Sequence, residues 1–180
     1  SENTADKLFY QPKITTHQLK AKYIDQTFAI HIAQPIQRKD GTERFPVIYA
    51  TDANMNFGAL RDISRMLQSS GLAPRYILVG IGYPESQTLQ AGVRRARDLS
   101  LLPEPPRSTA VESLKKTVSS GSIEGMDLPD IKNIHAGAGD FLDFIRQELI
   151  PFVEKNYPVE PDDRAYYGYS AGGRFGWYTL

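Results

Sequence analysis

The alternation of apolar and polar residues predicts two short strands near the amino terminus. Over residues 17–32, apolar side chains occupy every second position in two stretches, one around Leu19 and one around Ile30. A period of two is typical of a strand that buries one face. Asp25 and Gln26 lie between the stretches and predict the turn that joins them. We therefore expect two adjacent strands.

A strand–helix–strand pattern follows. Residues 45–50 and 76–82 form nearly continuous apolar runs, which are typical of strands covered on both faces. Between these runs, apolar residues recur at helical spacing, namely Phe57, Leu60, Ile63, Met66 and Leu67. Two parallel strands joined by a helix form a unit whose crossover is right-handed.

The stretch from residue 85 to about 139 is rich in proline, glycine and serine and shows little periodicity. Irregular segments of this length are uncommon in compact domains, and they usually cover a functional site or are disordered insertions. We interpret the stretch as a flexible lid or insertion; a simple linker is the alternative.

A second unit follows this stretch. Asp140 is expected to cap a long helix, which Pro151 should interrupt or kink and residues 156–158 should end. A short aromatic strand comes next, at residues 164–169. Two such units predict a single α/β domain over residues 1–180, with a mostly parallel, doubly wound sheet.

Composition narrows the classes of partner. The chain has 180 residues, of which 41% are hydrophobic and 23% charged, as in ordinary soluble domains. Its formal net charge is zero, which gives no reason to expect nucleic acid or an anionic membrane surface. It contains no cysteine, and no group of histidines and acidic residues has metal-ligand spacing, so we expect no metal. The sequence fits a cytoplasmic protein and an exported one equally well.

The most informative motif surrounds Ser170. Residues 168–172 fit Gly-x-Ser-x-Gly, the nucleophile elbow, in which a strand turns sharply into a helix and exposes the serine hydroxyl. Gly168 and Gly172 leave room for that turn. The Ala171 N–H would then be one donor to an oxyanion. A glycine-rich turn in which Ser170 merely caps the helix is the alternative, but the strand before and the apolar segment after the motif favour the elbow.

Taken together, these pieces resemble the Putative esterase family of α/β-hydrolases, which includes siderophore esterases and esterase-D-like enzymes. The likeness runs from about residue 17 to the end of the chain. Its pieces, in order, are residues 45–49, 78–84, 97–99, 141–145 and 149–157, followed by the elbow.

The resemblance implies a serine esterase that acts on siderophore-like or small acyl esters and needs no cofactor. Ser170 matches the nucleophile and Ala171 one oxyanion donor. The second donor matches the backbone N–H of Asn54, with Ala53 as the other possibility. Family members commonly carry Asp-Gly where this chain has Asp52 and Ala53, which puts the geometry of that loop in question.

The triad acid and histidine of an α/β-hydrolase follow the serine in chain order, yet no histidine, aspartate or glutamate follows Ser170. The resemblance therefore implies an α/β-hydrolase fold truncated after the elbow. We expect this chain alone to be weak or inactive, and to belong to a longer protein or to be completed by a partner copy. The alternatives are a noncatalytic ligand-binding relative and a strand-exchanged homo-oligomer.

Other polar residues are weaker candidates. His31 is expected at a surface or half-buried strand position, and His135 could line a pocket. Asp52 could hydrogen-bond the oxyanion loop. The basic cluster of residues 94–97 could attract an anionic substrate, although a solvated charged face is the favoured interpretation, and Asp98 could hold a salt bridge.

Overall fold

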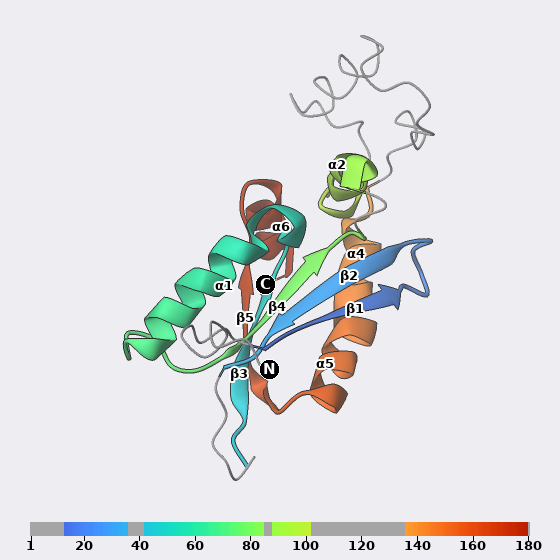
Figure 1. Cartoon of the computed structure of the whole chain (residues 1–180). Helices are drawn as coiled ribbons and strands as arrows, with labels where there is room; N and C mark the ends of the chain where they lie inside the picture. Colours follow the sequence, from blue (N-terminus) through green and yellow to red (C-terminus); the bar gives the residue numbers. More distant parts are fainter. Residues whose placement is uncertain (1–12, 36–41, 85–87, 102–135, 180) are drawn as a thin grey trace, which may run out of the picture.

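The computed structural model describes residues 13–35, 42–84, 88–101 and 136–179, which build a five-stranded sheet (Figure 1). In chain order the strands are β1 (Ile14–Lys20), β2 (Thr27–Ala33), β3 (Phe45–Ala50), β4 (Ile77–Gly82) and β5 (Val159–Tyr167). In space they follow the order β1-β2-β4-β3-β5. The predicted neighbours β1 and β2 pair antiparallel along their whole length, with Ile14 opposite Ala33 and Lys20 opposite Thr27.

Most strands of the sheet share one direction. β3 is parallel to both β4 and β5, whereas β2 is antiparallel to both β1 and β4. Only β2 among the described strands therefore runs against the others. The predicted strand–helix–strand unit is confirmed by the parallel pair β3 and β4, which α1 (Ala53–Ser69) connects.

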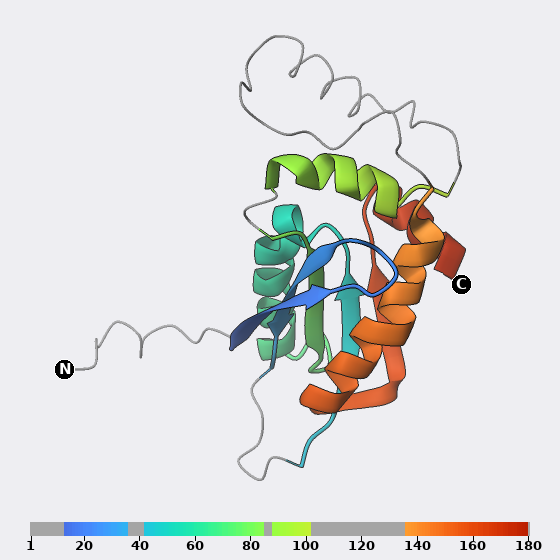
Figure 2. The ribbon, with the colours of Figure 1, turned by 90° about the vertical axis from the view of Figure 1, so that its right-hand side faces the viewer.

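Helices cover both faces of the sheet, as a doubly wound arrangement requires. Helix α1 lies on one face, and α4 (Ala138–Phe144), the π-helix η4 (Ile145–Leu149) and α5 (Ile150–Asn156) lie on the other (Figure 2). Helix α2 (Thr88–Asp98) and helix α6 (Ala171–Thr179) complete the described helices. Both predicted layers are thus present, and the predicted α/β class is confirmed.

The two faces differ in the size of their cores. The face beneath α4 and α5 buries five phenylalanine rings, and Phe28 and Phe144 stack with centroids 4.4 Å apart. Phe45, Phe141 and Phe175 complete the group, so α6 packs on this face as well. The face beneath α1 holds a smaller cluster built mainly of alanines around Phe57.

Helix α1 does not bury the whole apolar stripe that its sequence predicts. Phe57 is buried, but Ile63 is 50% exposed and Met66 57% exposed. The helix turns the buried Ser64 toward the sheet instead. Periodicity locates an apolar stripe, but it does not decide which side of that stripe faces the sheet.

Part of the stretch expected to have little structure is regular. Residues Thr88–Asp98 form α2, and α4 begins at Ala138. Residues 102–135, which carry most of the proposed lid and include His135, lie outside the described residues. The lid stays a prediction.

The long helix after this stretch also differs from expectation. Gly137, not Asp140, is the residue that precedes its first turn, and Asp140 lies within that turn, where a negative charge favours the helix dipole. Pro151 does not break the helix, because η4 precedes it and shifts the backbone hydrogen bonds from i−4 toward i−5. The predicted end near Asn156 is confirmed.

The helix after the elbow is only partly buried. Phe175 is fully buried, but Trp177 is 81% exposed and Tyr178 is 50% exposed. The apolar segment that follows the motif is therefore a helix, but only part of it is buried. The place of Trp177 and Tyr178 in α6 turns them away from the sheet, whereas Phe175 faces Phe141.

Candidate active site

The candidate site lies where two parallel strands end side by side. β3 and β5 are neighbours, with Ala50 opposite Tyr167, and the Thr51 N–H donates to the Tyr167 carbonyl oxygen at 3.2 Å. The loop that begins α1 and the loop that begins α6 therefore leave the same edge of the sheet. Ligands of open α/β sheets bind at this carboxyl edge.

Each of these loops turns through one residue in the left-handed region. Asp52 has φ 63° and Ser170 has φ 56°, and they are the non-glycine residues of the described chain with positive φ. Non-glycine residues in this region carry strain and cluster at active sites. The strain at Ser170 is what the nucleophile elbow predicts.

The serine turn is held by backbone contacts and leaves its side chain exposed. The Gly172 N–H donates to the Tyr169 carbonyl at 2.9 Å, and the Arg174 N–H donates to the Ser170 carbonyl at 3.2 Å. A Cβ on Gly168 would lie 2.4 Å from the carbonyl carbon and oxygen of Gly172. The turn thus requires glycine at position 168, as the motif predicts.

The two loops interlock through Gly172 and Tyr166. A Cβ on Gly172 would lie 2.6 Å from Thr51 Oγ1, so only glycine allows α6 to approach β3 this closely. The Tyr166 hydroxyl donates to the Gly172 carbonyl at 2.9 Å and hydrogen-bonds Thr51 Oγ1 at 3.0 Å. Burial raises the pKa of Tyr166 to about 12, so this phenol stays protonated at neutral pH.

Both candidate oxyanion donors belong to first turns of helices. Ala171 is the first residue of α6, and Ala53 and Asn54 are the first two of α1. The first four N–H groups of a helix have no partner within it. Among the described backbone groups, the N–H groups of Met55 and Asn56 already donate to the Asp52 carbonyl. The N–H groups of Ala53 and Asn54 come before these two in α1 and are the candidate donors.

The side chain of Asn54 fixes the start of α1 against the end of β4. Asn54 Oδ1 accepts from the Tyr83 N–H at 2.7 Å, and its Nδ2 donates to the Tyr83 carbonyl at 2.8 Å. Beside this clamp is a cavity of about 670 Å³, which His31, Phe57 and Tyr83 help to line. Its volume lies within the range of small-molecule sites, about 300–1,000 Å³.

An ion pair that the sequence does not predict holds the Asp52 turn. Arg95 Nε donates to Asp52 Oδ1 at 2.5 Å, and its second donor reaches Oδ2 at 2.9 Å. The Asp52 side chain is only 6% exposed. The same guanidinium donates to the Tyr169 carbonyl at 3.4 Å, so α2 is tied to both loops. The hydrogen bond to Asp52 raises the pKa of Arg95.

The rest of the basic cluster is also engaged within the chain. Asp98 is completely buried and accepts hydrogen bonds from Arg97 Nε at 2.6 Å and the Tyr83 hydroxyl at 2.9 Å. Burial raises the pKa of both Asp98 and Tyr83. Arg94 donates to Gln26. The cluster is therefore not a solvated charged face, whereas the salt bridge suggested for Asp98 is present.

The described histidines do not reach Ser170. His17 Nε2 shares a hydrogen bond with the Tyr157 hydroxyl at 2.5 Å, and the half-buried His31 shares one with Thr16 Oγ1 at 3.0 Å. Within the ranges given above, no side chain hydrogen-bonds Ser170 Oγ. The described part of the chain also holds no cluster of three metal-ligating side chains. None of its helices is long and apolar enough to cross a membrane.

Comparison with known proteins shows that this chain is similar to esterases. The model of the family described as Putative esterase matches residues 115–179. The ferri-bacillibactin esterase BesA of Bacillus subtilis is 28% identical over 93% of this chain and 53% of its own length. The siderophore triacetylfusarinine C esterase of Aspergillus fumigatus is 28% identical over 86% of this chain and 46% of its own. The chain thus spans about half the length of these curated relatives.

Solved structures show the same fold. The siderophore hydrolase EstB from Aspergillus nidulans superposes with a TM-score of 0.66 at 26% identity, over 93% of this chain and 52% of that one. The BES protein from Bacillus cereus gives a TM-score of 0.67 at 22% identity, over 93% and 57%. The fold is therefore that of the α/β-hydrolases, and the predicted resemblance of this chain to the Putative esterase family is confirmed.

Proposed function

We propose that this chain carries the nucleophile and the oxyanion hole of a serine carboxylic-ester hydrolase. One observation carries the proposal: an exposed Ser170 in the left-handed conformation directly precedes α6, at the strand edge where α1 also begins. The names of the relatives support a siderophore-like or other small acyl ester as the substrate. The cavity beside Asn54 is the proposed place for the body of that substrate.

In the proposed reaction, Ser170 Oγ attacks the ester carbonyl carbon while a histidine that is not among the described residues accepts the hydroxyl proton. The Ala171 and Asn54 N–H groups donate to the resulting oxyanion. Collapse of this tetrahedral intermediate breaks the bond to the alcohol, which leaves with the proton. Water then hydrolyses the acyl-serine by the same steps and releases the acid.

The roles of Asp52 and Arg95 in this proposal are structural. Asp52 turns the chain so that the first N–H groups of α1 point out of the sheet edge, and Arg95 neutralises its buried carboxylate. The contact of Arg95 with the Tyr169 carbonyl supports the serine turn from the same guanidinium. Fixed donors of this kind stabilise a developing negative charge without reorganisation.

Labelling with a fluorophosphonate, followed by intact-mass and peptide analysis, tests the proposal. In the protein isolated from the cells that make it, we expect one adduct on Ser170 and none in Ser170→Ala. In the separately produced 180-residue chain we expect little or no adduct, because a serine without a general base is a weak nucleophile. The proposal is wrong if the isolated protein is folded and remains unlabelled at Ser170.

The outer strand β5 favours one alternative, a homo-oligomer formed by strand pairing. β5 pairs with β3 on one side, and among the described strands none pairs with its other side. Residues 160–165 are exposed. An open edge of this kind can accept a further strand. Light scattering over a range of concentrations tests the alternative: a mass near twice 20.2 kDa supports it, and a constant mass of 20.2 kDa contradicts it.

A further inference from the structure

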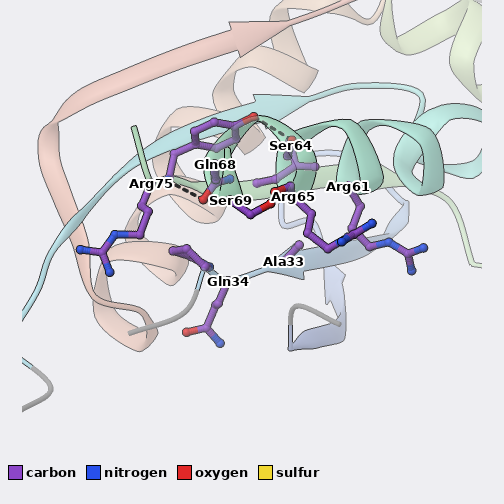
Figure 3. A pocket seen from close by; sticks show the side chains of 11 residues that line it. Ala33, Gln34, Arg61, Ser64, Arg65, Gln68, Ser69 and Arg75 are labelled. Carbon is purple, nitrogen blue, oxygen red and sulfur yellow. Dashed lines mark hydrogen bonds between the residues drawn. The ribbon is translucent and has the colours of Figure 1, made fainter. Parts of the chain in front are cut away.

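A second cavity lies at the opposite end of α1 from the candidate active site. It has a volume of about 90 Å³ and sits between the second half of α1, the end of β2 and the start of β4 (Figure 3). Gln68 in its wall is 14 residues along α1 from Asn54, which corresponds to about 21 Å at 1.5 Å per residue. The two sites are therefore separate.

The floor of this cavity is apolar. Ala33 of β2 and Leu78 of β4 face each other in the register of the sheet, and Pro35 follows at the end of β2. Ala33 and Leu78 are 6% and 3% exposed. A cavity of about 150 Å³ with apolar walls accepts benzene. The smaller volume here fits a short hydrocarbon body rather than a ring or a siderophore.

The α1 wall supplies hydrogen-bond donors that are not used within the described chain. Ser64, which is 8% exposed, accepts from the Tyr76 hydroxyl at 2.7 Å, so its own hydroxyl hydrogen is available. Gln68 Oε1 accepts from the Tyr76 N–H at 3.3 Å, which leaves both hydrogens of its Nε2. A bound anion can accept hydrogen bonds from both groups.

Among the described residues, the rim of the cavity carries one more positive than negative side chain. Arg61 is paired with Asp62 at 2.8 Å, and Arg75 is paired with Glu43. Among the described residues, no carboxylate forms an ion pair with Arg65, which is exposed beside Ser64 and Gln68. Counted over the described residues alone, three arginines and two carboxylates give a net charge of +1 at the mouth. A guanidinium binds a carboxylate through two parallel N–H groups.

We propose that this cavity binds a small aliphatic monocarboxylate. The hydrocarbon body lies on Ala33, Pro35 and Leu78, and the carboxylate accepts hydrogen bonds from Arg65, Gln68 and Ser64. The apolar floor distinguishes such an acid from an inorganic anion, and the cationic rim distinguishes it from a neutral molecule of the same shape. The site is independent of Ser170 chemistry.

Titration of the ¹⁵N-labelled chain with butyrate, followed by amide chemical shifts, tests the proposal. We expect saturable shifts at Ala33, Ser64, Gln68 and Leu78, with no change at Asn54 or Ala171. Butyramide, which has the same shape without the charge, should leave these amides unshifted. Arg65→Gln should weaken butyrate binding about tenfold, because it removes a charge-assisted contact.

Arg146→Gln is the matched control, because Arg146 is exposed on η4, across the sheet from the cavity, and its loss changes the net charge equally. It should bind butyrate as the unmodified chain does. Equal shifts with butyramide, unchanged affinity in a folded Arg65→Gln, or shifts confined to Asn54 and Ala171 would each overturn the proposal. Equal shifts with sulfate would overturn the assignment to an organic acid.

Discussion

The turn at Asp52 and the turn at Ser170 have the same backbone but are held in different ways. Both follow parallel strands, both are left-handed and both begin a helix. The Asp52 side chain is buried and paired with Arg95. The Ser170 side chain is exposed, and its turn is held through its backbone, by main-chain hydrogen bonds and by donors from Tyr166 and Arg95. The side chain that supports its turn is fixed by an ion pair, and the side chain that we propose to react makes no such contact.

Adding a side chain atom inside the serine turn should cause the largest loss of stability. Gly168→Ala would place a Cβ 2.4 Å from backbone atoms of Gly172, which cannot move without shifting α6. We expect it to lower the free energy of unfolding by about 3 kcal/mol in urea denaturation. Gly58→Ala in α1 is the control, since nothing lies within 4 Å of its Cβ, and it should stabilise by about 0.5–1 kcal/mol. Equal effects of the two changes would refute the close packing.

Removing the Arg95 guanidinium should destabilise the turn at Asp52. Arg95→Met leaves the buried Asp52 carboxylate without its bidentate partner, and we expect a loss of about 2 kcal/mol in the same urea assay. Arg174→Met, at an exposed position of α6, should change stability by less than about 0.5 kcal/mol. In a double-mutant cycle with Asp52→Asn, the two losses should not add. Additive losses would mean that the two side chains act independently.

Removing the backbone strain at Ser170 should raise the stability of the chain. Ser170→Gly removes the Cβ from a left-handed residue, and we expect the free energy of unfolding to rise by about 1 kcal/mol in thermal or urea denaturation. Ser170→Ala keeps the Cβ and the strain, so its stability should stay close to that of the unmodified chain. A glycine variant no more stable than the alanine variant would show that the turn is unstrained.

An effect of similar size is expected at the contact between the two turns. Tyr166→Phe removes the hydrogen bonds to Gly172 and Thr51 and should cost about 1 kcal/mol at pH 7. Since the folded pKa of Tyr166, about 12, is above its unfolded value of 10, the stability it contributes is complete below pH 10 and is lost as pH rises through 12. The difference in free energy of unfolding between the unmodified chain and Tyr166→Phe should therefore disappear between pH 10 and 12 in urea denaturation. A difference that stays constant with pH would contradict the raised pKa of Tyr166.

The unmodified chain and Tyr166→Phe should also share a second loss of stability at high pH. Burial raises the pKa of Tyr49 and Tyr83 as well, so the unmodified chain and Tyr166→Phe should both lose stability in alkali. Only the difference between the two curves reports on Tyr166.

Sequence predicted the parts of the site that depend on local constraint. The glycines around Ser170 are required by a turn that spans five residues, and the apolar runs of β3 and β4 are required by burial on both faces. The Asp52–Arg95 pair joins residues 43 positions apart through the docking of α2, and no local pattern encodes it. The burial of Ser64 in place of Ile63 likewise depends on how α1 rotates against β4.

The π-helix η4 has a consequence for changes in chain length. Phe144, Leu149 and Val153 are all fully buried, yet at 100° per residue Val153 would lie about 180° around a regular α-helix from Phe144. The wider turn of η4 absorbs one residue and returns the later side chains to the sheet. The segment thus behaves as a one-residue insertion. Deleting the exposed Gln147 together with Pro151→Ala should give an unbroken α-helix with the same buried face, whereas a deletion anywhere else in the helix would rotate one end out of the core.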